Sequence, residues 1–210
     1  MSNAIDENVS FNFVPRAYRP SKPRSFGMTE IRAPYYDTYG TRHLQDVFDV
    51  IEISTGFIML PTSGLERLVE KVANAGLKAK PELDIQIGSG GDSTEAELAA
   101  ESDKDVGDLI DRGKRALGPG ASIIMIESEG ITENVVEWNT GAAASIINGL
   151  GLENVMFEAA DGPVFEWYVK NYGNECNLFV DHNQILQLEG LRQNIWGNKS
   201  TRGRVINPRP

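Results

Sequence analysis

The feature that most constrains the fold is an alternation of short apolar runs with longer helical patterns along most of the 210 residues. Six runs have the length of a β-strand, at residues 26–33, 50–54, 77–87, 122–127, 154–159 and 176–181. Helical patterns separate the later runs, at residues 63–76, 94 to about 118, 131–149, 162–173 and 181–194. The first of these opens with a capping box, Ser63-x-x-Glu66, and ends at Gly76. This alternation predicts βαβ units and a parallel sheet, the α/β class.

Polar side chains recur near the C-terminal ends of the predicted strands. Residues that alternate along a strand share one face, and the polar members of these faces are Glu52 and Ser54, Lys80 and Glu82, Glu127, Glu158, and Asn177 with Asp181. No G-x-G-x-x-G follows the first strand, so a dinucleotide-binding fold lacks its fingerprint. In a (β/α)8 barrel the strand ends converge on one mouth, where active sites lie. The pattern therefore predicts a shared polar site at a barrel mouth.

A structural ion pair is the alternative interpretation of any single carboxylate. Lys22, Arg24, Lys78 and Lys80 are available partners for such pairs. Four strands that end on polar groups favour a shared site over separate pairs.

A glycine-rich stretch, IGSGGDS at 87–93, follows one predicted strand and precedes a second capping box, Thr94-x-x-Glu97. The backbone N–H groups at Gly90 and Gly91 could approach an anion at a helix N-terminus. A plain connecting loop is the alternative interpretation, because such loops are commonly rich in glycine.

Composition excludes several classes of function. The net charge of −10 argues against nucleic acid or an anionic membrane as a general partner. With Cys176 as the single cysteine and no Cys/His cluster, neither an intrachain disulfide nor a structural zinc site is expected. A metal here would be a hard cation held by oxygens, such as Mg2+. No run approaches the ~20 apolar residues of a membrane span, and the N-terminus lacks the order of a secretory signal, so we expect a cytoplasmic protein.

Several segments occur in an order that is similar to a known family. They are KPRSFGMTEI, IEISTGF, GLKAKPELDIQIGSGGD, IMIESEGITENVVEW, VMFEAAD, NLFVDHNQILQLEGLR and IWG. Between Lys22 and about Gly197 the chain resembles the phosphosulfolactate synthase (ComA-like) family, and most closely its eukaryotic branch, the heat-stress-associated proteins of plants and their fungal relatives.

The resemblance implies an aldolase-type TIM barrel and a lyase activity. Archaeal members add sulfite to phosphoenolpyruvate with Mg2+, giving (2R)-phospho-3-sulfolactate on the route to coenzyme M. The implied site residues fall into three groups. The catalytic group is Lys80, Glu82 and Glu127. The substrate-binding group is Lys22, Arg24, Ser54 and Asn177, joined by Gly90 and Gly91 of the glycine-rich stretch. The metal ligands are Glu52, Glu129 and Glu158.

This sequence departs from the archaeal pattern at two positions of the site. Archaeal members have lysines after the P-E strand, where this chain runs Leu83-Asp84-Ile85-Gln86. They also have an arginine between the two glutamates of the acidic strand, where this chain has Ser128. The proton donor and one anion contact of the archaeal pattern therefore have no direct counterpart here, and Lys80 is the candidate substitute for the donor.

A third departure concerns the barrel itself. A complete barrel has eight βα units in about 250 residues, whereas six strands are recognisable here. The segment TRHLQDVFDV leads directly into IEISTGF, so the second and third units are missing. We therefore expect an open, gapped barrel domain at 22–197, interrupted after Val50, between poorly ordered segments at 1–21 and 198–210.

Three functional hypotheses follow. The first is a phosphosulfolactate synthase-type enzyme that uses Mg2+, phosphoenolpyruvate and sulfite. The second is a non-catalytic protein of stress tolerance that acts through a protein partner or as a homo-oligomer. The third is a shortened chain with no independent function.

Overall fold

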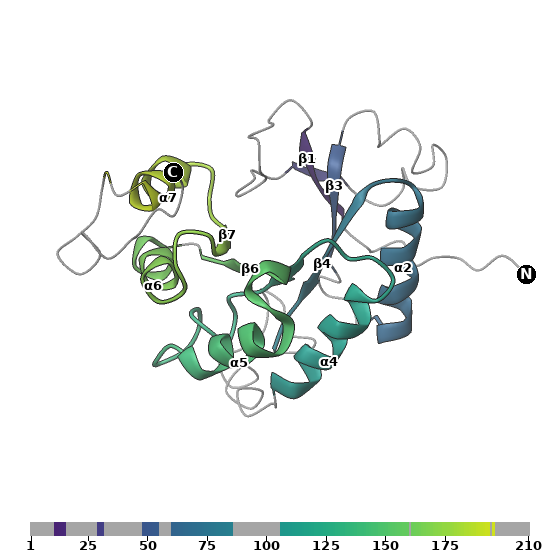
Figure 1. Cartoon of the computed structure of the whole chain (residues 1–210), viewed down its shortest axis with the longest axis horizontal. Coiled ribbons are helices and arrows are strands. Elements are labelled where there is room, and N and C mark those ends of the chain that lie inside the picture. The colour runs from purple at the N-terminus through teal and green to yellow at the C-terminus, as the bar shows by residue number, and fades with distance from the viewer. Residues whose placement is uncertain are drawn as a thin grey trace, which may run out of the picture.

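The computed structural model describes residues 11–15, 29–31, 48–54, 60–85, 106–159, 161–193 and 195, with the backbone alone for 11–15, 29–31 and 48. A seven-stranded sheet runs through this part of the chain in the order β2-β1-β3-β4-β5-β6-β7 (Figure 1). The strands are β1 (Phe11–Pro15), β2 (Thr29–Ile31), β3 (Phe48–Ile53), β4 (Lys78–Leu83), β5 (Ile124–Ile126), β6 (Val155–Glu158) and β7 (Asn177–Phe179).

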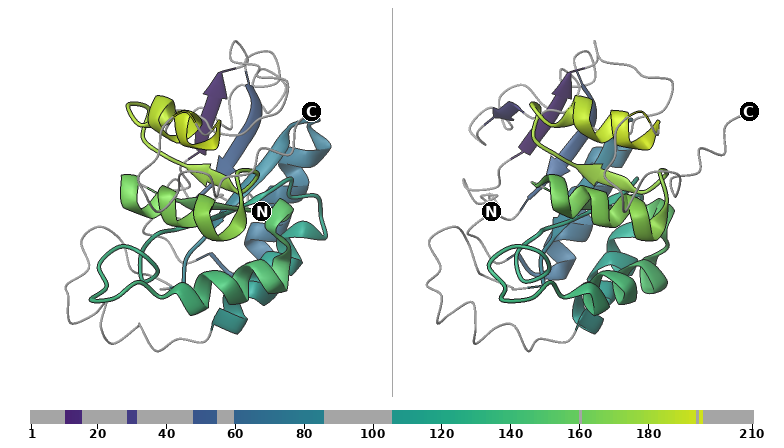
Figure 2. Two further views of the ribbon diagram at one scale, coloured as in Figure 1. Left: turned by 60° about the vertical axis from the view of Figure 1, so that its left-hand side comes forward. Right: turned by 90° about the vertical axis from the view of Figure 1, so that its left-hand side faces the viewer.

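The five strands from β3 to β7 are parallel and lie side by side in chain order. The helices are α2 (Thr62–Asn74), α4 (Val106–Leu117), α5 (Thr140–Leu150), α6 (Gly162–Tyr172) and α7 (Ile185–Arg192), and a short 3-10 turn, η2 (Leu152–Asn154), precedes β6. The sheet curls, and the helices lie around its outer side (Figures 1 and 2). The predicted α/β class is confirmed.

The outer face of the sheet carries the hydrophobic core. Ile51, Ile53, Leu83, Ile126 and Phe157 are each at most 1% exposed and pack with the helices. Their apolar partners on the helices recur at the spacing of a buried stripe, as at Leu65, Val69 and Val72 of α2. Because side chains alternate along a strand, the residues between the apolar ones face the concave side.

The predicted incomplete barrel is also confirmed. Among the described residues, β7 pairs with β6 alone, and β3 at the other end of the parallel strands pairs antiparallel with β1. Five parallel strands are fewer than the eight whose tilt and stagger close this kind of barrel. The concave face is therefore that of an open half-barrel.

The antiparallel ribbon of β1 and β2 covers the edge of β3. β2 falls inside the predicted strand at 26–33, but it pairs antiparallel with β1 and is not one of the parallel strands, so the parallel strands number five rather than the six expected. β1 was not predicted and lies in the segment at 1–21 that we expected to be poorly ordered. Its signal is the alternation of Phe11 and Phe13 with polar Asn12. Pairing with this ribbon removes an unpaired strand edge, which is otherwise prone to association with other chains.

Helix boundaries differ from the predictions at three places, the smallest being α7, which begins at Ile185 rather than at residue 181. α2 has Pro61 at its N-cap position and no side-chain cap, so the capping box at Ser63 is wrong, and Glu66 contacts Arg115 instead. The expected left-handed glycine at the other end is confirmed, with Gly76 at φ 78°.

The helix predicted over 131–149 begins nine residues late, at Thr140. Residues 131–139 form turns in which Asn134 adopts φ 52°. The Asn139 side chain then accepts a hydrogen bond from the Ala142 N–H at 3.1 Å and starts α5. An asparagine cap at this point outweighs the apolar periodicity that precedes it.

Candidate functional site

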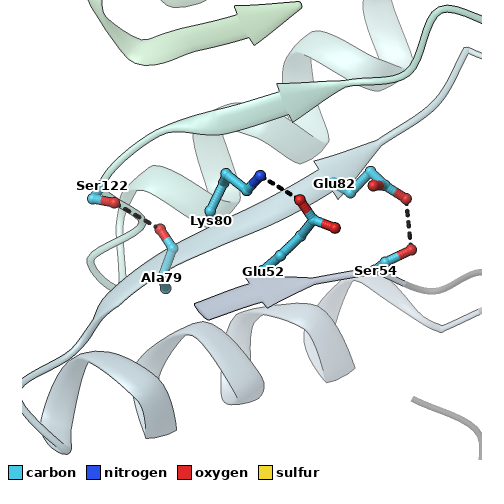
Figure 3. Close-up of polar contacts among 6 residues, drawn as sticks. All are labelled: Glu52, Ser54, Ala79, Lys80, Glu82 and Ser122. Atoms are coloured by element: carbon cyan, nitrogen blue, oxygen red, sulfur yellow. Dashed lines mark hydrogen bonds and ion pairs between the residues drawn. The ribbon is translucent and has the colours of Figure 1, made fainter. Parts of the chain in front are cut away.

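The β3–β4 register creates a buried ion pair on the concave face. Glu52 lies directly opposite Lys80, and the Lys80 ammonium forms an ion pair with the Glu52 carboxylate (Figure 3). The Glu52 side chain is 1% exposed and the Lys80 side chain is 4% exposed. The Lys80 Nζ also lies 5.2 Å from the ring centroid of Phe179 in β7. Lys80 is thus held between β3 and the far strand of the sheet.

Two residues further along the same strands, Ser54 and Glu82 form a second polar pair. The Ser54 hydroxyl donates to Glu82 Oε1 at 2.5 Å (Figure 3). Burial raises the pKa of Glu82 to about 7, with a further upward contribution from the Glu52 charge. The Ser54 hydrogen bond and the Lys80 charge oppose this shift. A carboxyl group with a pKa near neutral pH can take up or release a proton under physiological conditions.

Glu127 follows β5 and continues the polar row. Its backbone N–H donates to the Leu83 carbonyl at 3.0 Å, which fixes its position beside β4. Burial raises the pKa of Glu127 to about 10, and the charges of Glu82 and Glu158 and a hydrogen bond with Glu158 add to this effect. Glu127 therefore carries a proton at neutral pH.

Glu158 at the end of β6 is held by Ser128. The Ser128 hydroxyl oxygen lies 2.8 Å from Glu158 Oε2, and the Ser128 N–H donates to the same oxygen at 3.3 Å. The hydroxyl also lies 2.6 Å from Glu133 Oε2. Ser128 is thus a link between two carboxyl groups.

The predicted metal ligands do not meet. Glu52 is paired with Lys80, and Glu158 with Ser128. Glu129 accepts hydrogen bonds from Asn134 Nδ2 at both carboxylate oxygens, at 2.9 and 3.0 Å. In the described part of the chain, no three His, Cys, Asp or Glu side chains are grouped closely enough to hold a metal ion. In the described part of the chain, the residues assigned to Mg2+ are therefore engaged with protein partners and do not form a metal site.

The remaining predicted site residues fall into two groups. Asn177 pairs with Met156 in the register and donates from Nδ2 to the Val155 carbonyl at 3.2 Å, so its amide braces β6 and β7. Lys22, Arg24, Gly90 and Gly91 lie outside the described residues.

The contact of Glu133 with Ser128 and the contact of Phe179 with Lys80 were not predicted from the sequence. Glu133 lies in the stretch that was predicted to be helical, so its contact with Ser128 had no visible signal. Phe179 shares a strand face with Asn177, and that alternation could have pointed to its contact with Lys80.

The single cysteine lies in the core. Cys176 is buried, and burial raises the pKa of its thiol to about 11. A thiol with such a pKa is a core residue rather than a nucleophile.

Comparison with known proteins defines the class of this half-barrel. The family model for (2R)-phospho-3-sulfolactate synthase (ComA) matches residues 47–198. The chain therefore belongs to the phosphosulfolactate synthase family. The match begins one residue before β3, so it spans the predicted interruption after Val50.

A curated relative is Protein HEAT-STRESS-ASSOCIATED 32 of Arabidopsis thaliana. It is 26% identical over 252 aligned positions, which cover 83% of this chain and 88% of the relative. Since 83% of 210 residues is about 174, roughly 80 aligned positions have no residue from this chain, close to the length of two barrel units.

Proposed function

We propose that this chain is a phosphosulfolactate synthase-type lyase whose concave face adds sulfite to phosphoenolpyruvate. The observation that supports it most is the group of interacting carboxyls at the ends of β4, β5 and β6. There the pKa of Glu82 is raised to about 7 and that of Glu127 to about 10. Perturbed carboxyls that share one face are typical of sites that transfer protons.

Glu127 is the proposed proton donor of the reaction, because its carboxyl group is protonated at neutral pH. The sulfur lone pair of sulfite attacks the methylene carbon of phosphoenolpyruvate, and the π electrons move to C2 and into the carboxylate. C2 then takes the proton of the Glu127 carboxyl, which gives phosphosulfolactate and a Glu127 carboxylate. Lys80 contributes positive charge on the same face, with Glu52 as its partner.

The proposal also includes residues that would contact the substrate. Ser54, Asn177, Lys22, Arg24, Gly90 and Gly91 are the proposed contacts for its anionic groups. Mg2+ stays a prediction of the family resemblance. We further propose a cytoplasmic location, since the single cysteine is a buried thiol. Among the described helices, none has the length and apolar character needed to cross a bilayer.

A non-catalytic role in stress tolerance is the second candidate. Two observations favour it: the name of the plant relative, and the positions after Glu82 and at Ser128, where archaeal members carry cationic residues. In this case the polar face would serve structure, and the protein would act through a protein partner.

The experiment that separates the two follows phosphosulfolactate formation by 31P NMR. The full chain is incubated with phosphoenolpyruvate and sulfite, once with Mg2+ and once with EDTA. Glu127→Gln removes the donor, and Glu137→Gln changes an exposed carboxylate of the adjacent segment. If the chain is the proposed enzyme, we expect product from the wild type and from Glu137→Gln. The rate of Glu127→Gln should be lower by a factor of about a hundred or more. No product from a folded wild type in either buffer would favour the second candidate.

A further inference from the structure

Lys80 and Phe179 meet across the concave face although β5 and β6 lie between their strands in the sheet. The Lys80 Nζ lies over the face of the Phe179 ring, 5.2 Å from its centroid. Neighbouring strands are about 4.8 Å apart, so β4 and β7 would be roughly 14 Å apart in a flat sheet. The contact therefore depends on the curl of the sheet, which turns the side chains of its concave face towards one another (Figure 1).

Both partners of this contact are held by their neighbours. Glu52 lies directly opposite Lys80 in the register and pairs with its ammonium from β3 (Figure 3). The Ala159 N–H donates to the Phe179 carbonyl at 2.8 Å, which fixes the end of β7 beside β6. Lys80 is buried and Phe179 is half-buried. The ammonium thus lies between a carboxylate from β3 and a ring face from β7.

The ring gives Lys80 a second attractive partner. A lysine side chain has a flexible four-carbon stem, and the Glu52 charge alone would draw its ammonium towards β3. The Phe179 ring attracts the ammonium from the other side, because the face of an aromatic ring carries partial negative charge, and this attraction is stronger where water is excluded. The ion pair joins one Glu52 oxygen to the ammonium, which has three hydrogens to donate. A bound anion can therefore share the same ammonium.

We propose that Phe179 is a positioning residue that holds the Lys80 ammonium between β3 and β7, where it binds an anionic oxygen of phosphoenolpyruvate. The inference rests on the proposed function, in which the concave face holds this substrate. Phe179 acts through Lys80 and takes no part in bond formation. Loss of the ring should therefore weaken anion binding only in a chain that has Lys80, whereas a purely structural ring would matter equally with and without it.

Dissociation constants for phosphoenolpyruvate, measured on the full chain by isothermal titration calorimetry without sulfite, test this role in the absence of turnover. We expect Phe179→Leu to weaken binding about tenfold, because it removes the ring face and keeps an apolar side chain. Phe179→Tyr keeps the ring and should restore binding to within about twofold of the wild type. Tyr172→Leu removes a half-buried ring from the outer helix α6 and should leave binding unchanged.

A chain without Lys80 shows whether the ring acts through the ammonium. In the Glu52→Gln/Lys80→Met background, the further change Phe179→Leu should alter the dissociation constant by less than about twofold, since the two residues would otherwise be coupled. Near-UV circular dichroism checks that each variant is folded, and Phe179→Met, which fills more of the volume of the ring, replaces Phe179→Leu if that variant is not. Equal weakening with and without Lys80 would overturn the positioning role, as would wild-type affinity in Phe179→Leu.

Two further outcomes separate the positioning role from the proposed reaction. Weakened binding in Phe179→Leu, in a protein that forms no phosphosulfolactate, would support the positioning role and contradict the reaction. A folded wild type that binds neither phosphoenolpyruvate nor inorganic phosphate would overturn the positioning role, because Lys80 then holds no anion. In that case the 31P NMR assay decides the reaction alone.

Discussion

Lys80 lies directly opposite Glu52 in the β3–β4 register and forms with it an ion pair whose two side chains are almost wholly buried. In this pair the positive charge of Lys80 neutralises the negative charge of Glu52 on the concave face. Glu82 of β4 and Glu127 after β5 differ from this pair, because burial and, after it, neighbouring carboxylate charges raise their pKa values. The proposed chemistry depends on that difference.

Removal of one member of the buried pair should be far more damaging than removal of both. We expect Lys80→Met to lower the free energy of unfolding by about 3–5 kcal/mol, because it leaves the Glu52 carboxylate buried without its partner. The double variant Glu52→Gln/Lys80→Met should recover most of this loss, as measured by urea unfolding. The matched control is Glu66→Gln/Arg115→Gln, which removes an ion pair between the outer helices and should have little effect. A double variant no more stable than Lys80→Met would show that the loss of stability in Lys80→Met does not come from the unpaired charge of Glu52.

Glu82 should make the protein less stable as the pH rises towards neutrality. Its pKa is raised from 4.5 to about 7 in the folded chain, so the folded state binds more protons than the unfolded state between these values. The resulting stability is complete below about pH 4.5 and is lost as the pH rises through about 7. Glu82→Gln should remove this part of the pH dependence, seen as a flatter plot of melting temperature between about pH 5 and about pH 8. The same slope in wild type and variant would contradict the assignment.

The contact between α4 and α5 predicts an unusual response to alanine. A Cβ at Gly149 of α5 would lie 2.7 Å from Ile110 Cγ2 of α4, and the branched isoleucine side chain has little freedom to move away. Gly149→Ala should therefore destabilise the protein by about 1–3 kcal/mol, although glycine to alanine normally favours a helix. Gly141→Ala in the same helix is the control, since its Cβ would meet Asn139 Oδ1 at 3.8 Å. Equal stability of the two variants would mean that the helices can separate at no cost.

Phe157 should be the core residue on which the sheet depends most. Its ring is 1% exposed and stacks on Tyr168 of α6 with centroids 4.7 Å apart. We expect Phe157→Ala to cost about 3–5 kcal/mol in urea unfolding. Leu186→Ala, at an apolar side chain that is 76% exposed, should change little. A small loss in Phe157→Ala would indicate that β6 and α6 repack freely.

Strand faces could be predicted from the sequence because they depend only on alternation. The placement of Glu52, Lys80 and Glu82 on one face follows from their spacing, and the register then brings Glu52 and Lys80 together. Which strand lies beside which depends on long-range pairing, and for β3 to β7 it follows chain order.

Contacts made by turns could not be predicted in the same way. Glu129 was expected to face the mouth, but the turn at 128–134 directs it to Asn134. The link from Ser128 to Glu133 depends on that same turn, which the apolar periodicity of the stretch had suggested was helical. β1 was missed because its pairing with β3 joins residues that are far apart in the sequence.

We propose above all that the concave face of this open half-barrel binds the substrate of the family. The measurement that tests it most directly is thermal unfolding of the full chain, followed by near-UV circular dichroism, with and without phosphoenolpyruvate. We expect a cooperative transition whose midpoint rises with phosphoenolpyruvate concentration, because a ligand that binds only the folded state stabilises it. The rise should be weaker for Glu52→Gln/Lys80→Met. A cooperative transition with the same midpoint at every phosphoenolpyruvate concentration would contradict it.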